Sequence, residues 1–131
     1  MSMDIINHIE LPVQDVDRSR RFYEAALSPL GLALVVSTTA ASDGRGRYGF
    51  GRNRYPTFWI HEESGVSRTV HIAFTAPDRP AVRAFHGAAL ACGGTSNGEP
   101  GIRERYHSAY YAAYLLDPDG NNIEAVCQDS A

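Results

Sequence analysis

Two histidines and one glutamate are the residues of this sequence best suited to chemistry. His8 and His71 each interrupt a run that contains apolar and β-branched residues, and Glu124 interrupts a third such run. Two imidazoles and one carboxylate form the donor set of a facial triad, which leaves positions on a divalent metal open for water or substrate. This set suits Fe²⁺, Mn²⁺, Ni²⁺ or Zn²⁺. A single histidine in a strand is more often structural than a ligand, so the prediction depends on what relates the two histidines.

An internal repeat relates them. When the sequence is shifted against itself by 63 positions, nine of 24 residues in segments 8–31 and 71–94 are identical, and His8 falls on His71. Chance would give roughly two identities at average residue frequencies. The 131 residues are therefore predicted to form one domain, residues 1–131, from two copies of one module, residues 4–63 and 68–128. Packing the copies about a pseudo-twofold axis can bring the two histidines together.

Each copy has the pattern of a strand, a helix and three further strands. Segments 5–11 and 69–75 alternate between apolar and polar residues, as strands do. Asp15 and Asp78 each precede a helical pattern, where a short carboxylate can accept hydrogen bonds from the first backbone N–H groups. The remaining predicted strands are 33–38, 48–51, 57–61, 95–97, 110–116 and 122–127. Both copies are therefore predicted to have the element order βαβββ.

Composition excludes several kinds of function. All 12 basic residues are arginine, which excludes a lysine Schiff base, a lysine general base and a phosphate-binding loop with its lysine. The net charge is −3 and the arginines are scattered, so nucleic-acid binding is not expected. The longest apolar run, 109–116, is too short to span a membrane, and the N-terminus does not resemble a secretory signal. We therefore expect a cytoplasmic protein with neither nucleic acid nor a membrane as its partner.

A few further residues are given no chemical role. Cys92 and Cys127 lie 35 positions apart and are expected to be reduced and mostly buried. His86 is expected on the exposed face of the second helix. Arginines flank the hairpin predicted in the first copy; we expect them to be solvated rather than to bind an anion, and they are Arg45, Arg47, Arg52 and Arg54.

Four segments make the chain similar to the vicinal oxygen chelate superfamily, which includes glyoxalase I, extradiol dioxygenases, fosfomycin-resistance thiol transferases and bleomycin-resistance proteins. They are NHIEL at 7–11, SRRFY at 19–23, VHIAF at 70–74 and, most distinctively, DPDGNNIEAV at 117–126. The chain also resembles small glyoxalase-like bacterial proteins. The resemblance implies an α+β fold in which curled mixed sheets from two modules surround a central cup. It also places His8, His71 and Glu124 on the superfamily's metal-ligand positions.

The resemblance leaves the fourth ligand position open. Glyoxalase I has a glutamate there, in the last strand of its first module. Matching the hydrophobic pattern puts Trp59 at this place, whereas continuing the 63-residue shift puts His61 there. Either way the chain departs from glyoxalase I, and Trp59 is expected to form a wall of the cup. Glu10, on the face of His8, and Tyr110 are expected to line the substrate pocket together with Trp59 and His61.

Two kinds of function follow from this resemblance. Extradiol dioxygenases hold Fe²⁺ and use nearby His and Tyr groups for proton transfer, which makes His107 and Tyr111 the candidate catalytic residues. The predicted function is a metal-dependent enzyme on a small oxygen-chelating substrate, either similar to lactoylglutathione lyase or an extradiol-type dioxygenase. The alternative is a binding or sequestration module of the resistance type, with a structural, adventitious or absent metal. By resemblance we also expect a homodimer.

Overall fold

The two modules of the chain have the same order of elements. The structure is a computed structural model that describes residues 6–39, 46–65 and 68–129. Within these ranges the first module contains β1 (Ile9–Val13), α1 (Val16–Leu27), the short 3₁₀ helix η1 (Ser28–Leu30), β2 (Ala33–Thr39), β3 (Gly46–Gly51) and β4 (Phe58–Glu62). The second contains β5 (His71–Thr75), α2 (Arg79–Ala91), β6 (Thr95–Ile102), β7 (Tyr111–Leu116) and β8 (Asn122–Cys127). The predicted α+β fold with two similar modules is confirmed.

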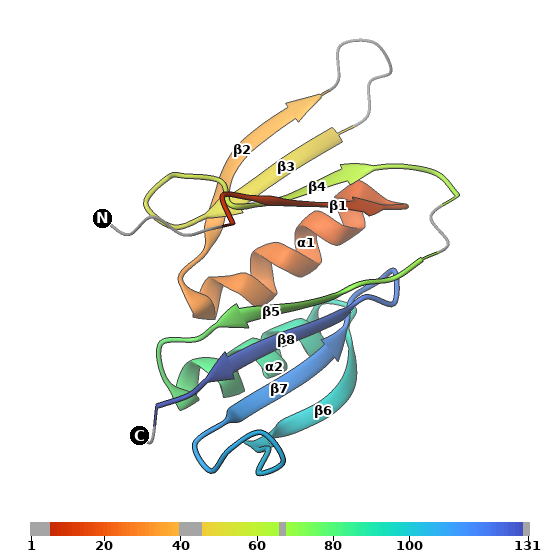
Figure 1. The fold of residues 1–131 in the computed structure, drawn as a ribbon. Helices are drawn as coiled ribbons and strands as arrows, with labels where there is room; N and C mark the ends of the chain where they lie inside the picture. Colours follow the sequence, from red (N-terminus) through yellow and green to blue (C-terminus); the bar gives the residue numbers. More distant parts are fainter. Residues whose placement is uncertain (1–5, 40–45, 66–67, 130–131) are drawn as a thin grey trace.

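The strands form two mixed sheets of the same topology. Their orders are β1-β4-β3-β2 and β5-β8-β7-β6. In each sheet the first strand of the module runs parallel to the last, and the other neighbours are antiparallel. Figure 1 shows the sheets side by side, with β1 and β5 as their facing edges and the two helices behind them. The sheets are not closed into a barrel.

Alternation along the strands determines which residues reach the core. Leu11 and Val13 of β1 are buried, as are Phe58 and Ile60 of β4. These side chains pack with the apolar face of α1, whose largest fully buried side chain is that of Tyr23. Because successive side chains of a strand point to opposite faces, the residues between them lie on the outer face of the sheet. This face of each sheet carries the polar residues considered below.

The predicted helix starts are confirmed. The Asp15 carboxylate accepts a hydrogen bond from the Arg18 backbone N–H, and Asp78 accepts one from Ala81. Each interaction satisfies a backbone donor that has no partner within its helix. Gly31 follows the first helical segment with a φ of 88°, in the left-handed region that glycine adopts without strain.

Buried polar contacts join the two modules. The Tyr23 hydroxyl of α1 donates a hydrogen bond to Oδ2 of Asp117, in the turn between β7 and β8, over 2.5 Å. The next acidic residue of that turn, Asp119, accepts hydrogen bonds from the Gln14 backbone N–H and from the Ser19 hydroxyl. The distinctive segment 117–126 therefore connects the second module to the start of the first helix.

Three local predictions were wrong. The first strand runs from Ile9 to Val13 instead of 5–11, so His8 lies just before it and not at its centre; Ile5 lies outside the described residues. His86 is buried, and its Nε2 lies 2.9 Å from the Ser96 hydroxyl. Cys92 is exposed, whereas Cys127 is buried as predicted, and both are free thiols.

No helix among the described residues is long and apolar enough to cross a bilayer.

Candidate functional site

In the second module, the fold brings His71 and Glu124 together. Parallel pairing of β5 with β8 places Ala73 opposite Glu124 and His71 opposite Asn122, all on the outer face of the sheet. Nε2 of His71 lies 2.8 Å from Oε1 of Glu124. The Glu124 side chain is 3% exposed and that of His71 is 53% exposed, so the histidine covers a nearly inaccessible carboxylate.

Tyr110 binds the other oxygen of the same carboxylate. Its hydroxyl donates a hydrogen bond to Oε2 of Glu124 over 2.5 Å. Partial burial and the neighbouring Glu124 charge raise the pKa of Tyr110 well above its ordinary value, so the phenol stays protonated and remains a donor. Both carboxylate oxygens of Glu124 therefore have a protein partner. The sequence placed Tyr110 in the pocket but gave no sign that it would contact Glu124.

His8 does not join this pair within one chain. It is exposed, and its Nδ1 lies 2.8 Å from the Oδ1 atom of Asn7. In ranges 6–39, 46–65 and 68–129, no three His, Cys, Asp or Glu side chains are arranged to hold a metal ion. The chain thus supplies two of the three predicted donors in one place, His71 and Glu124. A complete donor set does not form among the described residues of one chain, and the His8, His71 and Glu124 triad stays a prediction.

In the first module, the equivalent face has no carboxylate at the position of Glu124. Strand pairing places Glu10 opposite Trp59, and Ala73 opposite Glu124. Glu10 and Ala73 are repeat mates 63 positions apart, whereas Trp59 and Glu124 are 65 apart, so the intervening segments differ by two residues. The register therefore makes Trp59, not His61, the counterpart of Glu124. His61 lies two residues further along the same face.

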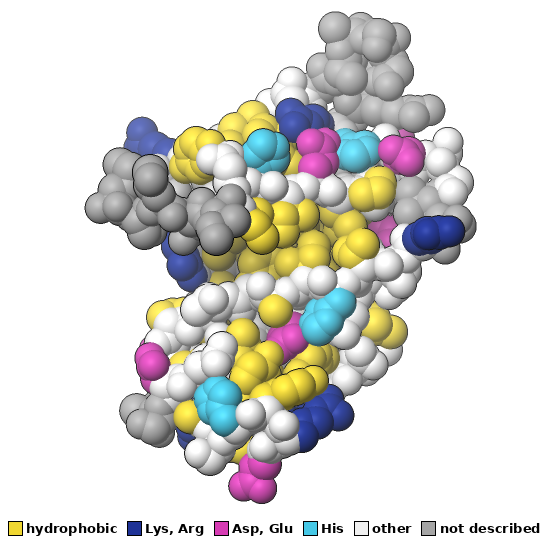
Figure 2. Space-filling model, in the orientation of Figure 1, with side chains coloured by type: hydrophobic (Ala, Val, Ile, Leu, Met, Phe, Trp, Pro, Cys, Tyr) yellow, Lys and Arg dark blue, Asp and Glu magenta, His cyan; other side chains and the backbone are white. Residues whose placement is uncertain are grey.

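Glu10, His61 and Arg47 form a polar cluster around Trp59. Arg47 of β3 donates two hydrogen bonds to the Glu10 carboxylate, from Nε over 3.0 Å and from Nη2 over 2.8 Å. Nδ1 of His61 lies 2.7 Å from Oε2 of Glu10, although no regular hydrogen bond joins them. The hydrogen bonds from Arg47 hold the pKa of Glu10 below its ordinary value, so this carboxylate is ionised at neutral pH. Figure 2 shows basic, acidic and histidine side chains gathered on the first sheet.

Arg47 is the residue of this face that the sequence reasoning missed. Its guanidinium carbon lies 3.9 Å from the centroid of the Trp59 ring. We expected a solvated loop at this hairpin, but Arg47 belongs to β3 and pairs with His61 of β4. Alternation along β3 was the available signal, but it has no meaning until the partner strand is known. Arg45 lies outside the described residues.

The two candidate catalytic residues lie in different surroundings. Both ring nitrogens of His107 have partners: Nδ1 accepts from the Ala109 backbone N–H, and Nε2 lies 2.9 Å from Oε1 of Gln128. Tyr111 is on the opposite face of β7 from Tyr110, where its hydroxyl accepts a hydrogen bond from Arg83 of α2. The structure does not bring Tyr111 to Glu124. The catalytic roles of His107 and Tyr111 stay predictions.

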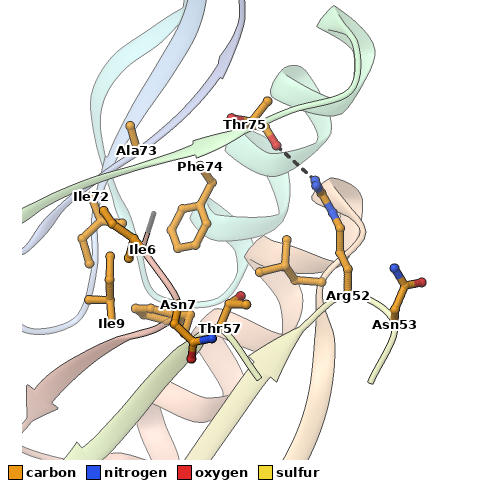
Figure 3. Close-up of a pocket in the computed structure, with 12 residues that line it drawn as sticks. Ile6, Asn7, Ile9, Arg52, Asn53, Thr57, Ile72, Ala73, Phe74 and Thr75 are labelled. Atoms are coloured by element: carbon orange, nitrogen blue, oxygen red, sulfur yellow. Dashed lines mark hydrogen bonds between the residues drawn. The ribbon is translucent and has the colours of Figure 1, made fainter. Parts of the chain in front are cut away.

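A cavity of about 660 Å³ lies between the facing edges of β1 and β5. Figure 3 shows Ile9, Ile72 and Phe74 along it and Arg52 at one end, where Nη2 donates a hydrogen bond to the Thr75 carbonyl over 3.2 Å. Its walls contain both apolar and polar residues, and none of His8, His71 and Glu124 lines it. The cavity reaches the outer face of the second sheet at Ala73, the residue opposite Glu124.

Comparison with known proteins identifies the superfamily to which this chain belongs. The family model described as Glyoxalase/Bleomycin resistance protein/Dioxygenase superfamily matches residues 5–125. The chain belongs to this superfamily. No curated protein matches the sequence.

Solved structures agree with this assignment. A glyoxalase/bleomycin resistance protein from Albidiferax ferrireducens T118 is 32% identical, with a TM-score of 0.75, over 96% of this chain and 100% of that chain. Glyoxalase I from Zea mays is 23% identical, with a TM-score of 0.70, over 93% of this chain but only 45% of its own. A mutant of the fosfomycin resistance protein FosX from Listeria monocytogenes, in complex with Mn(II) and a dihydroxypropylphosphonic acid, is 17% identical. It has a TM-score of 0.68 and coverages of 95% and 93%. The last two likenesses show the fold alone.

Proposed function

We propose that the chain is a metal-dependent enzyme that acts on a small oxygen-chelating substrate at a centre shared between two copies. His71 and Glu124 of one copy would supply two ligands, and His8 of a second copy would supply the third. The observation that carries the proposal is the 2.8 Å contact between His71 Nε2 and Glu124 Oε1. One imidazole and one carboxylate already converge there, and each is a common ligand of Fe²⁺, Mn²⁺, Ni²⁺ and Zn²⁺.

The environment of Glu124 supports a cation at this place. A buried carboxylate is costly unless its charge is compensated. Among the described residues, the partners of Glu124 are His71 and the neutral Tyr110 hydroxyl, with no arginine in an ion pair with it. A divalent metal would supply the compensating charge, and when bound it would act as a Lewis acid on the oxygens of the substrate. Tyr110 would hold the carboxylate in place from its far oxygen.

The exposed edges of the sheets support a homodimer. The facing edge strands β1 and β5 each pair with a single neighbour in this chain. Large apolar side chains near these edges are exposed, including Ile6, Ile9 and Val70. Exposed apolar groups beside free strand edges are typical of surfaces that another chain covers. A second copy on this surface could place its His8 beside the His71–Glu124 pair, which one chain alone does not do.

Metal binding by purified protein tests the proposal. Metal-free protein is dialysed against each of Fe²⁺ (anaerobically), Mn²⁺, Ni²⁺ and Zn²⁺, and bound metal is measured by mass spectrometry. We expect the wild type to bind about one ion per copy and the variants His71→Ala and Glu124→Gln to lose at least tenfold in affinity. Glu99→Gln is the matched control, since Glu99 is an exposed carboxylate 3.3 Å from another histidine, His86. Equal metal binding by all four proteins would overturn the proposal.

A second function is favoured by the residue at the fourth position. Trp59, the counterpart of Glu124, cannot ligate a metal or transfer a proton. The chain could therefore bind or sequester a small molecule without turnover, as the resistance-type alternative states. A ligand recovered unchanged after long incubation with metal-loaded protein would support this function, and product formation would exclude it. The reaction class and the cytoplasmic location stay predictions.

A further inference from the structure

The outer face of the first sheet carries a layered plate formed by Gly49, Trp59 and Arg47. The Trp59 ring lies directly over Gly49: a Cβ atom at this glycine would come within 3.0 Å of two indole carbons. The Arg47 guanidinium lies over the Trp59 ring, 3.9 Å from its centroid. Strand pairing supports this arrangement, because Gly49 of β3 is directly opposite Trp59 of β4. The ring is therefore held between the backbone and a cation.

Contacts with neighbouring residues fix the orientation of the upper layer. Arg47 donates two parallel hydrogen bonds to the Glu10 carboxylate, and this bidentate pairing restrains the plane of the guanidinium. His61 lies beside Glu10 and hydrogen-bonds through Nε2 to Glu63. The hydrogen bond to Glu10 also raises the pKa of Arg47, so the layer remains charged at every pH of interest. The plate is thus rigid before any ligand arrives.

One face of the Arg47 guanidinium remains accessible to a ligand. The Arg47 side chain is 38% exposed, although one of its faces covers Trp59. Its hydrogen bonds to Glu10 come from Nε and Nη2, which leaves the N–H groups of Nη1 for an acceptor elsewhere. A guanidinium is weakly hydrated on its faces and stacks readily on π systems. An open guanidinium face with a free donor at its rim matches a planar ring that carries a hydrogen-bond acceptor.

We propose that Arg47 and Trp59 form a binding subsite for a neutral, planar ring of the ligand, which stacks on the open face of Arg47. The charges of the cluster favour a neutral ring over an anion. Glu10 and Glu63 contribute two carboxylates for the single arginine, so a further negative group would be repelled. Arg47 is then a specificity-determining residue, and lysine, whose ammonium has no planar face, cannot replace it.

This subsite extends the proposed function and depends on it in only one respect. The proposed function is needed only to place the bound ring near the metal centre. Stacking on Arg47 itself requires no metal. Binding measured in the presence of a chelator therefore tests the subsite alone, whereas metal dialysis of His71→Ala and Glu124→Gln tests the metal centre alone. Each proposal can fail while the other stands.

The single tryptophan of the chain, Trp59, makes the test direct. Benzamide, a neutral planar ring with a carbonyl acceptor, is titrated into wild-type protein with a chelator present, and Trp59 fluorescence is followed. Cyclohexanecarboxamide, which has the same amide on a saturated ring, is tested as a competitor. We expect saturable quenching by benzamide and at least tenfold weaker competition by the saturated amide, because only the aromatic ring can stack.

Variants separate stacking from charge and from folding. Arg47→Lys keeps the charge and should weaken benzamide binding about fivefold or more. Glu10→Gln keeps the guanidinium but weakens the bidentate pairing that orients it, and should weaken benzamide binding less than Arg47→Lys does. The matched control is Arg20→Lys, because Arg20 lies over another ring, that of Tyr48, and pairs with Glu24 on α1. Its affinity should equal that of the wild type.

Three results would overturn the subsite. One is equal affinity for benzamide in wild-type protein and in Arg47→Lys, with both proteins shown to be folded by circular dichroism. The second is the absence of saturable quenching by benzamide. The third is competition by cyclohexanecarboxamide that is as strong as the binding of benzamide. If Arg47→Lys does not fold, the affinity of Glu10→Gln for benzamide is the deciding measurement. An affinity equal to that of the wild type would contradict the idea that Glu10 holds Arg47 in a preformed orientation for stacking.

Discussion

Replacing Tyr23 by phenylalanine removes one hydroxyl group from the buried contact between the modules. Tyr23 is fully buried, and its hydroxyl donates to a carboxylate, Asp117, that is 4% exposed. Hydrogen bonds to charged groups contribute about 1.5–3 kcal/mol to stability. The same oxygen, Oδ2, also accepts from Asn121 Nδ2 over 2.9 Å, so it does not become unpaired. We therefore expect the free energy of unfolding to fall by about 2 kcal/mol.

Denaturant unfolding followed by Trp59 fluorescence measures this loss. With an unfolding entropy of about 2.1 cal/mol/K per residue, a loss of 2 kcal/mol would lower the melting temperature of this chain by about 7 °C. Tyr55→Phe is the control: its hydroxyl donates to Asn7 over 2.9 Å, but the residue is 52% exposed. The control should lose less than about 0.5 kcal/mol. Comparable losses in the two variants, or none for Tyr23→Phe, would refute the argument that burial of Asp117 makes this contact strong.

Three further outcomes follow from the same contacts. Burial raises the pKa of Tyr23 well above its ordinary value, so the folded state keeps a proton that the unfolded state loses above about pH 10. Stability should therefore be full below that pH and decline as pH rises above it, less steeply in Tyr23→Phe; equal slopes in denaturant titrations would contradict this. Asp119→Ala removes the acceptor of two hydrogen bonds, from Gln14 and Ser19, and should cost about 1–2 kcal/mol in the same unfolding assay. Gly49→Ala should displace the Trp59 ring and change the tryptophan emission spectrum. An unchanged spectrum would contradict close packing of the ring against Gly49.

Much of the fold could be predicted from the repeat. Matching segments in the two halves indicate two equivalent modules, and Asp15 and Asp78 mark the starts of their helices. The first strand begins at Ile9 and ends at Val13, whereas alternation predicted residues 5–11. The strand continues through Pro12 since β1 is an edge strand with one unpaired side, where proline costs little.

The outer faces of the sheets could be predicted only in part. Alternation correctly places Glu10 and the buried Leu11 on different faces of β1, and it places Trp59 and His61 on the same face of β4. It could not decide between Trp59 and His61 as the counterpart of Glu124, because the intervening segments differ by two residues and only the strand pairing fixes the register. A shift of one residue along a strand changes the face, which is why Tyr110 meets Glu124 and its neighbour Tyr111 does not.

The Arg47–Trp59–Glu10 cluster could not be predicted for a different reason. Its members come from three strands, and their contacts depend on the order of the strands in the sheet. That order, β1-β4-β3-β2, cannot be read from local periodicity. The sequence also gave no indication that a single chain would leave His8 apart from the pair formed by His71 and Glu124. Pseudo-symmetry relates the two histidines in sequence but does not require that they meet within one chain.

Metal binding by mixed dimers tests the shared centre most directly. The variants His8→Ala and Glu124→Gln each lack a ligand, so each alone should bind little metal at a concentration that just saturates the wild type. After they are unfolded together and refolded, a mixed dimer contains one site with His8 from one copy and the intact His71–Glu124 pair from the other. Random pairing of equal amounts makes about half of the dimers mixed, and each mixed dimer has one complete site out of its two. The mixture should therefore recover about one quarter of the metal that the wild type binds. If the mixture binds no more metal than the separate variants, the ligands do not come from two copies and the proposed centre is wrong.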